Sequence, residues 1–229
     1  MVAAGKRCVY NRVEGSSAPW CHYPDSYGYR ASGDVQETAT GYQVTLTRSP
    51  EARAGQSAGF DDVILEVDMQ TDKRVRVKMY PKDVERWEVP TEVLDIENRS
   101  QAGVTNSTAH YNVTFSHEPT FSVRVSRKST GATIFDTSVP GLVMSEQFLQ
   151  VTSHLATDRM YGLGEHRHMT LQHDMDWKLW SMFTHDAPLN SDWNLYSQHP
   201  VYMIMEEDGS ANMVLLKNSN AMGVYLDRH

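Results

Sequence analysis

Short runs of alternating or apolar residues follow one another along most of the chain, and turn-forming residues bound each run. The runs are rich in valine, threonine, tyrosine, phenylalanine and leucine, which favour strands. Strands are predicted at 41–48, 63–69, 75–80, 86–89, 111–115, 121–128, 133–136, 148–155, 177–183, 202–206, 213–217 and 223–226. A 3.6-residue apolar period is not sustained over a dozen residues anywhere. The pattern predicts an all-β fold, a large antiparallel β-sandwich with its core between two facing sheets.

The clearest hairpin signal is Asp208-Gly209, between the apolar runs 201–204 and 213–216. Asp-Gly supplies the positive φ angles that tight hairpin turns require. We expect 201–204 and 213–216 to pair as an antiparallel hairpin, with a loop that can exceed two residues.

Composition supports a packed globular chain and argues against a nucleic-acid partner. The 229 residues are 40% hydrophobic, and 21 Lys and Arg stand against 29 Asp and Glu, for a net charge of −8. Nucleic-acid binding requires concentrated positive charge. In the one cationic cluster, 73–78, charged residues alternate with Val75 and Val77. This alternation predicts a strand whose charged face is exposed to solvent and whose valines point inward; an anion site is the alternative.

No apolar run reaches 18 residues, so we expect no membrane span, and residues 1–6 lack the apolar core of a signal peptide. Three sequons, at Asn98, Asn106 and Asn112, lie close together. They predict glycosylation there and favour a secreted or lumenal chain.

A histidine group, with Glu165, His166, His168 and His173, is the first candidate for chemistry. An H-x-H pair on a strand places both rings on one face, which a metal could use. A cupin-like site also requires a Glu shortly after, where Leu171-Gln172 stand. We therefore expect a hydrogen-bonded polar loop, with no metal and no cofactor.

Local geometry limits two further motifs. Trp177 and Trp180 are three residues apart, so on a strand they face opposite sides, and core packing of at least one is predicted. Asn218 and Asn220 are expected to hydrogen-bond within their own turn.

Several motifs together resemble the α-glucosidases of glycoside hydrolase family 31. They are Tyr161-Gly162-Leu163-Gly164-Glu165-His166, Asp186, Asn194-Leu195-Tyr196 and Asn218-Ser219-Asn220-Ala221-Met222. The resemblance implies a galactose mutarotase-like sandwich over 27–229. In the family a (β/α)8 barrel with the catalytic aspartates follows this sandwich. We expect an exposed apolar face where that barrel would pack.

A second resemblance covers residues 1–26. Cys8-Val9-Tyr10 and Pro19-Trp20-Cys21 resemble the closing half of a trefoil domain. Because the family partners of both cysteines are absent, the resemblance implies a partial trefoil remnant with two free thiols. A Cys8–Cys21 bridge remains the alternative.

The resemblance also implies a role for Asp186, on a loop that in the family reaches the mouth of the active site. Its carboxylate would accept hydrogen bonds from sugar hydroxyls. His185 before it and Ala187 after it depart from the family pattern. The alternative is an exposed Asp in a turn near Pro188.

No catalytic carboxylate pair is identified, because Asp174-Met175-Asp176-Trp177 only superficially resembles the family's nucleophile segment. We expect a noncatalytic region of an α-glucosidase, inactive alone, with α-glucoside oligosaccharides and the barrel as partners. The family implies a secreted, cell-surface or lysosomal location. The alternatives are a stand-alone carbohydrate-binding module and a mutarotase-like enzyme that uses a His and Glu pair.

Overall fold

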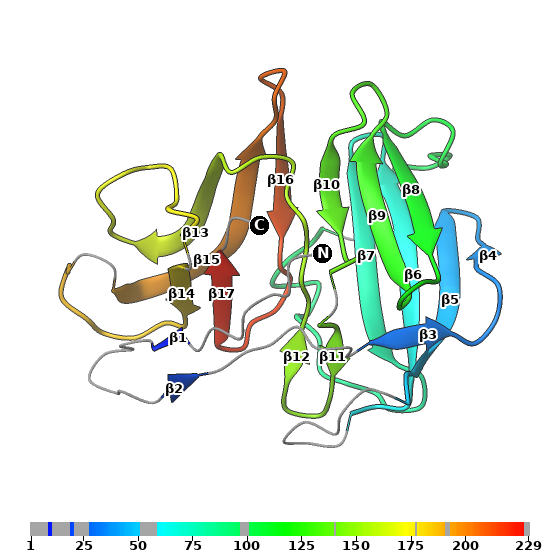
Figure 1. Ribbon diagram of the computed structural model, residues 1–229, viewed down its shortest axis with the longest axis horizontal. Helices are drawn as coiled ribbons and strands as arrows, with labels where there is room; N and C mark the ends of the chain where they lie inside the picture. Colours follow the sequence, from blue (N-terminus) through cyan, green and yellow to red (C-terminus); the bar gives the residue numbers. More distant parts are fainter. Residues whose placement is uncertain are drawn as a thin grey trace. The chain divides into compact units, whose positions relative to one another are not determined.

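The computed structural model describes residues 9–10, 19–20, 28–50, 59–96, 101–139, 141–176, 178–190 and 193–226. Every regular element in these segments is a β-strand, as predicted (Figure 1). The strands belong to two compact units. One lies within Pro24–Leu155. The other lies within Ala156–His229 and also includes β1 (Val9–Tyr10) and β2 (Pro19–Trp20). None of the described segments forms a helix capable of crossing a membrane.

The unit Pro24–Leu155 is a sandwich of two antiparallel sheets (Figure 1). One sheet has the order β3 (Tyr29–Ala31), β5 (Gly41–Arg48), β6 (Asp62–Thr71), β7 (Arg74–Pro81), and β4 (Gln36–Glu37) also pairs with β5. The other has the order β10 (Thr133–Asp136), β9 (Ser122–Arg127), β8 (Tyr111–Ser116). A small hairpin joins β11 (Val143–Met144) and β12 (Leu149–Gln150).

Strand periodicity explains the core of this sandwich. In β6, alternate residues are buried, namely Val63, Leu65, Val67 and Met69. Successive side chains of a strand point to opposite faces, so one face of β6 is apolar throughout. Val113, Val123 and Val125 of the other sheet are also buried. The rings of Tyr42 in β5 and Phe115 in β8 meet edge to face with centroids 5.2 Å apart, which joins the sheets.

The cationic cluster lies on β7, as the alternation predicted. Val75 pairs with Met69 and Val77 with Val67, so both valines share the core-side face of β6. The charged face meets acids: Arg76 lies 3.8 Å from Asp68, and the Lys78 ammonium lies 2.5 Å from the Glu88 carboxylate. These ion pairs place acidic partners beside two of the cluster's cations, which favours the solvent-facing side of a strand over an anion site.

The unit Ala156–His229 contains two further sheets. One has the order β13 (Met160–His166), β15 (Asn194–Met205), β16 (Ala211–Leu215), and the other pairs β14 (Lys178–Met182) with β17 (Met222–Leu226). The predicted hairpin is confirmed: β15 and β16 are antiparallel, residues 206–210 connect them, and Gly209 has φ 84°. Buried side chains of this unit include Met160, Trp180, Met182, Leu195, Ile204 and Leu226.

Two strand predictions were wrong. Residues 86–89 form no strand, because the Arg86 guanidinium donates to the carbonyl oxygens of Ser145 and Glu146 and stacks on Phe60. The predicted strand 148–155 is reduced to the two residues of β12. Cys8 and Cys21 lie outside the described residues, so the trefoil remnant at 1–26, its thiols and the boundary at residue 27 stay predictions.

Candidate functional site

The end of β13 departs from a regular ladder. Gly162 pairs with Tyr202, Gly164 with His199 and His166 with Asn194, so β15 takes more residues than β13 over the same stretch. Gly162 has φ 102°, and a Cβ atom there would lie 2.4 Å from the Val201 carbonyl oxygen, so only glycine fits. The irregular register brings His166 beside the first residue of β15.

The histidines fasten the loop 167–176 to the sheets. Both ring nitrogens of His166 lie at hydrogen-bonding distance from backbone carbonyl oxygens, Nε2 at 3.0 Å from Ser181 and Nδ1 close to Leu163. His173 is 2% exposed, and its Nε2 lies 2.7 Å from the Gly162 oxygen. Burial lowers the pKa of His173 below its usual 6.5. The polar-loop interpretation is therefore supported.

Trp180 is the apolar centre of this histidine group. Its ring centroid lies 4.5 Å from that of His166, 5.2 Å from His168 and 5.3 Å from His173. His168 in turn stacks on His173. Within the described part of the chain, no three His, Cys, Asp or Glu side chains gather in a way that could hold a metal ion.

A buried amide braces the segment that leads to Asp186. Asn194 is 6% exposed, and its Oδ1 accepts a hydrogen bond from Phe183 N at 3.0 Å. Its Nδ2 donates to the Phe183 carbonyl oxygen and, at 3.3 Å, to His185 Nδ1. His185 N also donates to Leu195 O at 3.3 Å. The side chain of Asn194 thus acts as an extra peptide group that pairs the loop with β15.

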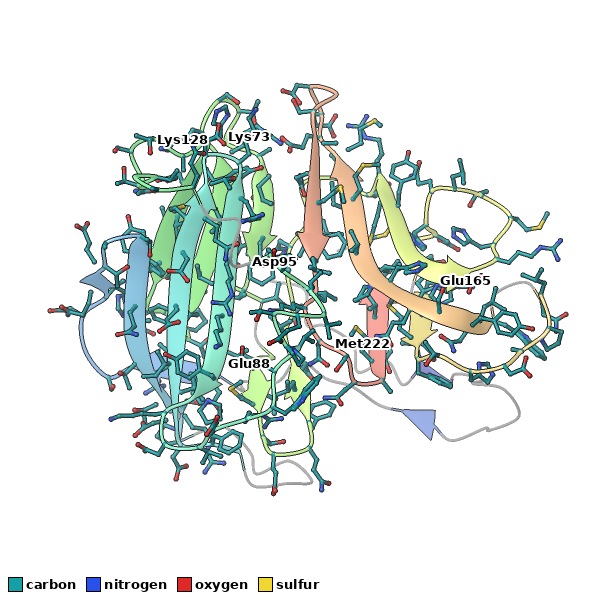
Figure 2. The ribbon with its side chains drawn as sticks, turned by 180° about the vertical axis from the view of Figure 1, so that it is seen from behind. Lys73, Glu88, Asp95, Lys128, Glu165 and Met222 are labelled. Atoms are coloured by element: carbon teal, nitrogen blue, oxygen red, sulfur yellow. The ribbon has the colours of Figure 1, made fainter. Side chains whose placement is uncertain are left out.

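Asp186 is exposed, and Tyr196 accompanies it. The nearby Asp186 carboxylate raises the pKa of Tyr196 above its usual 10, through hydrogen bonding to the hydroxyl and through its negative charge. The Tyr196 side chain is 54% exposed. Next to it, Glu165 Oε2 accepts hydrogen bonds from the backbone N and the hydroxyl of Ser197, each at 3.0 Å, and Figure 2 labels Glu165 at the end of β13. The result is a carboxylate beside an aromatic ring, both open to solvent.

Two loops joined by a hydrogen bond carry exposed apolar side chains, and one of them contains Asp186. Residues 167–176 follow β13 and residues 183–190 precede β15, and Arg167 donates to the Leu189 carbonyl oxygen at 3.1 Å, which joins them. Exposed apolar residues in or beside the loops are Met169, Leu171, Leu189 and Trp193. We call residues 167–176 and 183–190 the loop surface.

Other predicted residues have local roles. Asn218 Oδ1 accepts a hydrogen bond from Asn220 N at 2.8 Å, which confirms the turn, and the burial of Trp180 confirms the predicted core packing. Asp174 Oδ1 accepts from Asp176 N at 3.0 Å, a turn and not a catalytic arrangement. Trp177 lies outside the described residues.

The sequons differ in their surroundings. Asn98 lies outside the described residues, Asn112 is half-buried on β8, and Asn106 Oδ1 is buried without a hydrogen-bond partner in the structure. Glycosylation at all three stays a prediction.

Comparison with known proteins identifies the chain's relatives. It is 34% identical over 227 residues to human (Homo sapiens) intestinal sucrase-isomaltase, and the alignment covers 98% of this chain and 12% of that protein. It is 36% identical over 211 residues to mouse (Mus musculus) lysosomal alpha-glucosidase, and the alignment covers 91% of this chain and 21% of that protein. This chain is a homologue of one part of the glycoside hydrolase family 31 α-glucosidases. The resemblance noted from its motifs is confirmed.

The chain is also 34% identical over 233 residues to human probable maltase-glucoamylase 2, and this alignment covers 96% of this chain and 9% of that protein. No protein-family model matches the chain. The chain therefore spans about a tenth to a fifth of the length of these α-glucosidase relatives.

Proposed function

We propose that this chain acts as the noncatalytic sandwich region of an α-glucosidase that hydrolyses terminal α-linked glucose, and that it contributes Asp186 to the sugar site. The supporting observation is the exposed carboxylate of Asp186, which lies close enough to Tyr196 to raise the pKa of its hydroxyl. An ionised carboxylate accepts hydrogen bonds from sugar hydroxyls without itself donating. Buried Asn194 braces the segment just before Asp186, which holds the carboxylate ready for a ligand.

The carboxylates of this region have structural partners, which supports a noncatalytic role. A retaining glycosidase uses two carboxyl groups about 5 to 5.5 Å apart, one as nucleophile and one as acid and base. Here Glu165 accepts two hydrogen bonds from Ser197, and Asp174 closes its own turn. The catalytic pair is therefore assigned to a separate barrel.

The loop surface supports a partner for this region. Met169 is 90% exposed and Leu171 is 86% exposed, on a loop whose base the histidine group fixes. Apolar side chains held in water by an ordered loop base are typical of a surface that another protein covers. The proposed partner is the (β/α)8 catalytic barrel, with the substrate at its mouth.

A secreted, cell-surface or lysosomal location belongs to the same proposal. The relatives' names include an intestinal and a lysosomal enzyme, and the sequons fit a lumenal route. Loss of mass on treatment of the native, secreted chain with an N-glycosidase would support this location; an unmodified mass would count against it.

A stand-alone carbohydrate-binding module is the second candidate, because Tyr196 and Trp193 expose aromatic surface within ten residues of Asp186 in the sequence. Sugar rings pack their apolar faces on such side chains. Calorimetric titration with maltose separates the two: saturable binding by the chain alone that Asp186→Ala abolishes favours the module. The mutarotase-like alternative loses support, because His166 faces backbone carbonyls and His173 is buried.

Hydrolysis of a chromogenic α-glucoside tests the main proposal. The purified chain is assayed alone and together with a separately expressed family 31 barrel. We expect no activity from the chain alone and an increase in the barrel's activity on mixing. Asp186→Ala should remove most of that increase, whereas Asp83→Ala, at an exposed position in the unit Pro24–Leu155, should keep it. Activity of the chain alone would contradict the noncatalytic assignment.

A further inference from the structure

One buried histidine closes the loop 167–176 on β13. This loop lies between β13 and β14 (Figure 1). His173 N donates a hydrogen bond to the Met160 carbonyl oxygen at 2.9 Å, and His173 Nε2 lies 2.7 Å from the Gly162 carbonyl oxygen. The main chain and the side chain of His173 therefore hold the loop at two neighbouring points of the same strand. His173 is 2% exposed, so water does not reach this contact.

The hydrogen bond with Gly162 determines which nitrogen of the His173 ring carries the proton. A carbonyl oxygen can only accept, so Nε2 is the donor and Nδ1 is the bare nitrogen of a neutral imidazole. Among the described residues, Nδ1 is buried and finds no hydrogen-bond partner. A second proton could bind only at Nδ1, where it would create a buried charge and an unpaired donor. The closed loop therefore requires His173 to be neutral.

The surroundings of His173 are basic, which makes a positive charge there still less favourable. Three side chains share the Trp180 ring with it, namely His166 from β13, His168 from the loop and Lys178 from β14. The His168 ring stacks on that of His173 with centroids 4.9 Å apart, and the Lys178 ammonium lies 4.8 Å from the Trp180 centroid. Burial, the largest cause, and these three basic groups lower the pKa of His173 below 6.5, and its backbone hydrogen bond opposes them in part.

We propose that His173 is an acid-sensitive latch: as the pH falls, protonation of Nδ1 releases the loop 167–176 from β13 while the strands of the unit Ala156–His229 stay paired. Water stabilises the charge once the loop is open, so acid favours the open loop. Met169 and Leu171 lie on this loop, and its opening breaks up the loop surface. The latch itself does not depend on the proposed function.

Hydrogen exchange of the full chain at pH 7 and pH 5, read at the His173 amide by NMR, tests the latch. This amide is bonded to the Met160 oxygen only while the loop is closed. After correction for the intrinsic effect of pH on exchange, it should exchange faster at pH 5. The change is up to about thirtyfold if His173 has its ordinary pKa of 6.5 in the open loop. Amides within the β15–β16 hairpin should keep their protection.

Two outcomes with the unmodified chain would overturn the latch. One is equal corrected exchange of the His173 amide at pH 7 and pH 5. The other is an equal loss of protection in the loop and in the β15–β16 hairpin, because it would mean that the whole unit unfolds and the loop does not open by itself.

Substitutions identify the group that responds to acid. His173→Gln keeps a donor for the Gly162 oxygen but has no titrating ring, so its loop should exchange alike at both pH values. His154→Gln is the matched control, because His154 is exposed in the unit Pro24–Leu155, and it should leave the acid effect unchanged. An acid effect that persists in His173→Gln would assign the response to another group and overturn the inference.

The basic surroundings can be tested without changing His173. Lys178→Gln removes one of the charges that oppose protonation of the closed form, so the acid effect should be smaller than in the unmodified chain. This comparison also decides the matter if His173→Gln does not fold. An acid effect as large in Lys178→Gln as in the unmodified chain would refute the proposed electrostatic cause.

Discussion

Replacement of Asn194 by alanine should loosen the loop that carries Asp186. The change removes an acceptor for Phe183 N and a donor to the Phe183 carbonyl oxygen. Each bond contributes roughly 1 kcal/mol, and a buried group left unpaired costs about 1 to 3 kcal/mol. Phe183 is only half-buried, so water can satisfy part of what is lost. We expect unfolding of the unit Ala156–His229 to become easier by about 2 to 3 kcal/mol.

Urea unfolding followed by tryptophan fluorescence measures this loss, because Trp180 lies in the core of the same unit. Asn190→Ala is the matched control, since Asn190 is exposed and lies in the same loop. Its stability should stay within about 0.5 kcal/mol of the unmodified chain. Under the proposed function, Asn194→Ala should also reduce the increase in α-glucosidase activity that the chain gives to the barrel.

A second substitution at this position separates the two hydrogen bonds. Asn194→Asp keeps an acceptor for Phe183 N, but its carboxylate cannot donate to the Phe183 oxygen and is repelled by it. It should therefore be no more stable than Asn194→Ala at neutral pH. If Asn194→Ala and Asn190→Ala had equal stability, the bracing role of Asn194 would be refuted.

Three further predictions concern pH and the core. Burial lowers the pKa of His173, so the stabilising contribution of the neutral ring is complete above pH 6.5 and is lost as the pH falls through the pKa of the folded state. The urea midpoint should therefore drop less between pH 7 and pH 5 in His173→Gln than in the unmodified chain. Burial and Glu66 raise the pKa of Tyr80 to about 12, so stability should fall as the pH rises from 10 to 12, and Tyr80→Phe should reduce that fall in an alkaline unfolding series. Leu195→Ala should destabilise the chain by about 2 to 5 kcal/mol in urea, whereas the exposed Leu171→Ala should change it by less than about 0.5 kcal/mol; equal effects would refute the assigned core.

Strands bounded by clear turns could be predicted to the residue. The predictions at 41–48 and 133–136 coincide with β5 and β10, because alternation and flanking turn residues agree there. The apolar and polar pattern missed β13, where Gly162 and Gly164 interrupt the alternation. The segment 86–89 has strand-like residues, but the tertiary bonds of Arg86 to backbone carbonyls determine its path.

The candidate site was only partly predictable for a related reason. Asp186 could be named because a motif carries it. The hydrogen bonds between Asn194 and Phe183 join residues eleven positions apart, and they depend on the path by which the loop 183–190 returns to β15. No local pattern specifies that path. The motif Asn194-Leu195-Tyr196 was the available signal, and it marked these residues without showing their roles.

The site rests on buried and half-buried polar groups more than on apolar packing. Asn194, His166 and His173 each bond to backbone groups of the sheets or loops, and each supplies a partner where the strand ladder is interrupted. A buried polar side chain with fixed partners accepts few alternative positions, because a lost partner is costly. Such groups can hold an exposed carboxylate and ring in place on loops that would otherwise move. Substitutions that never touch a sugar should therefore affect binding at Asp186 as strongly as changes to the exposed surface itself.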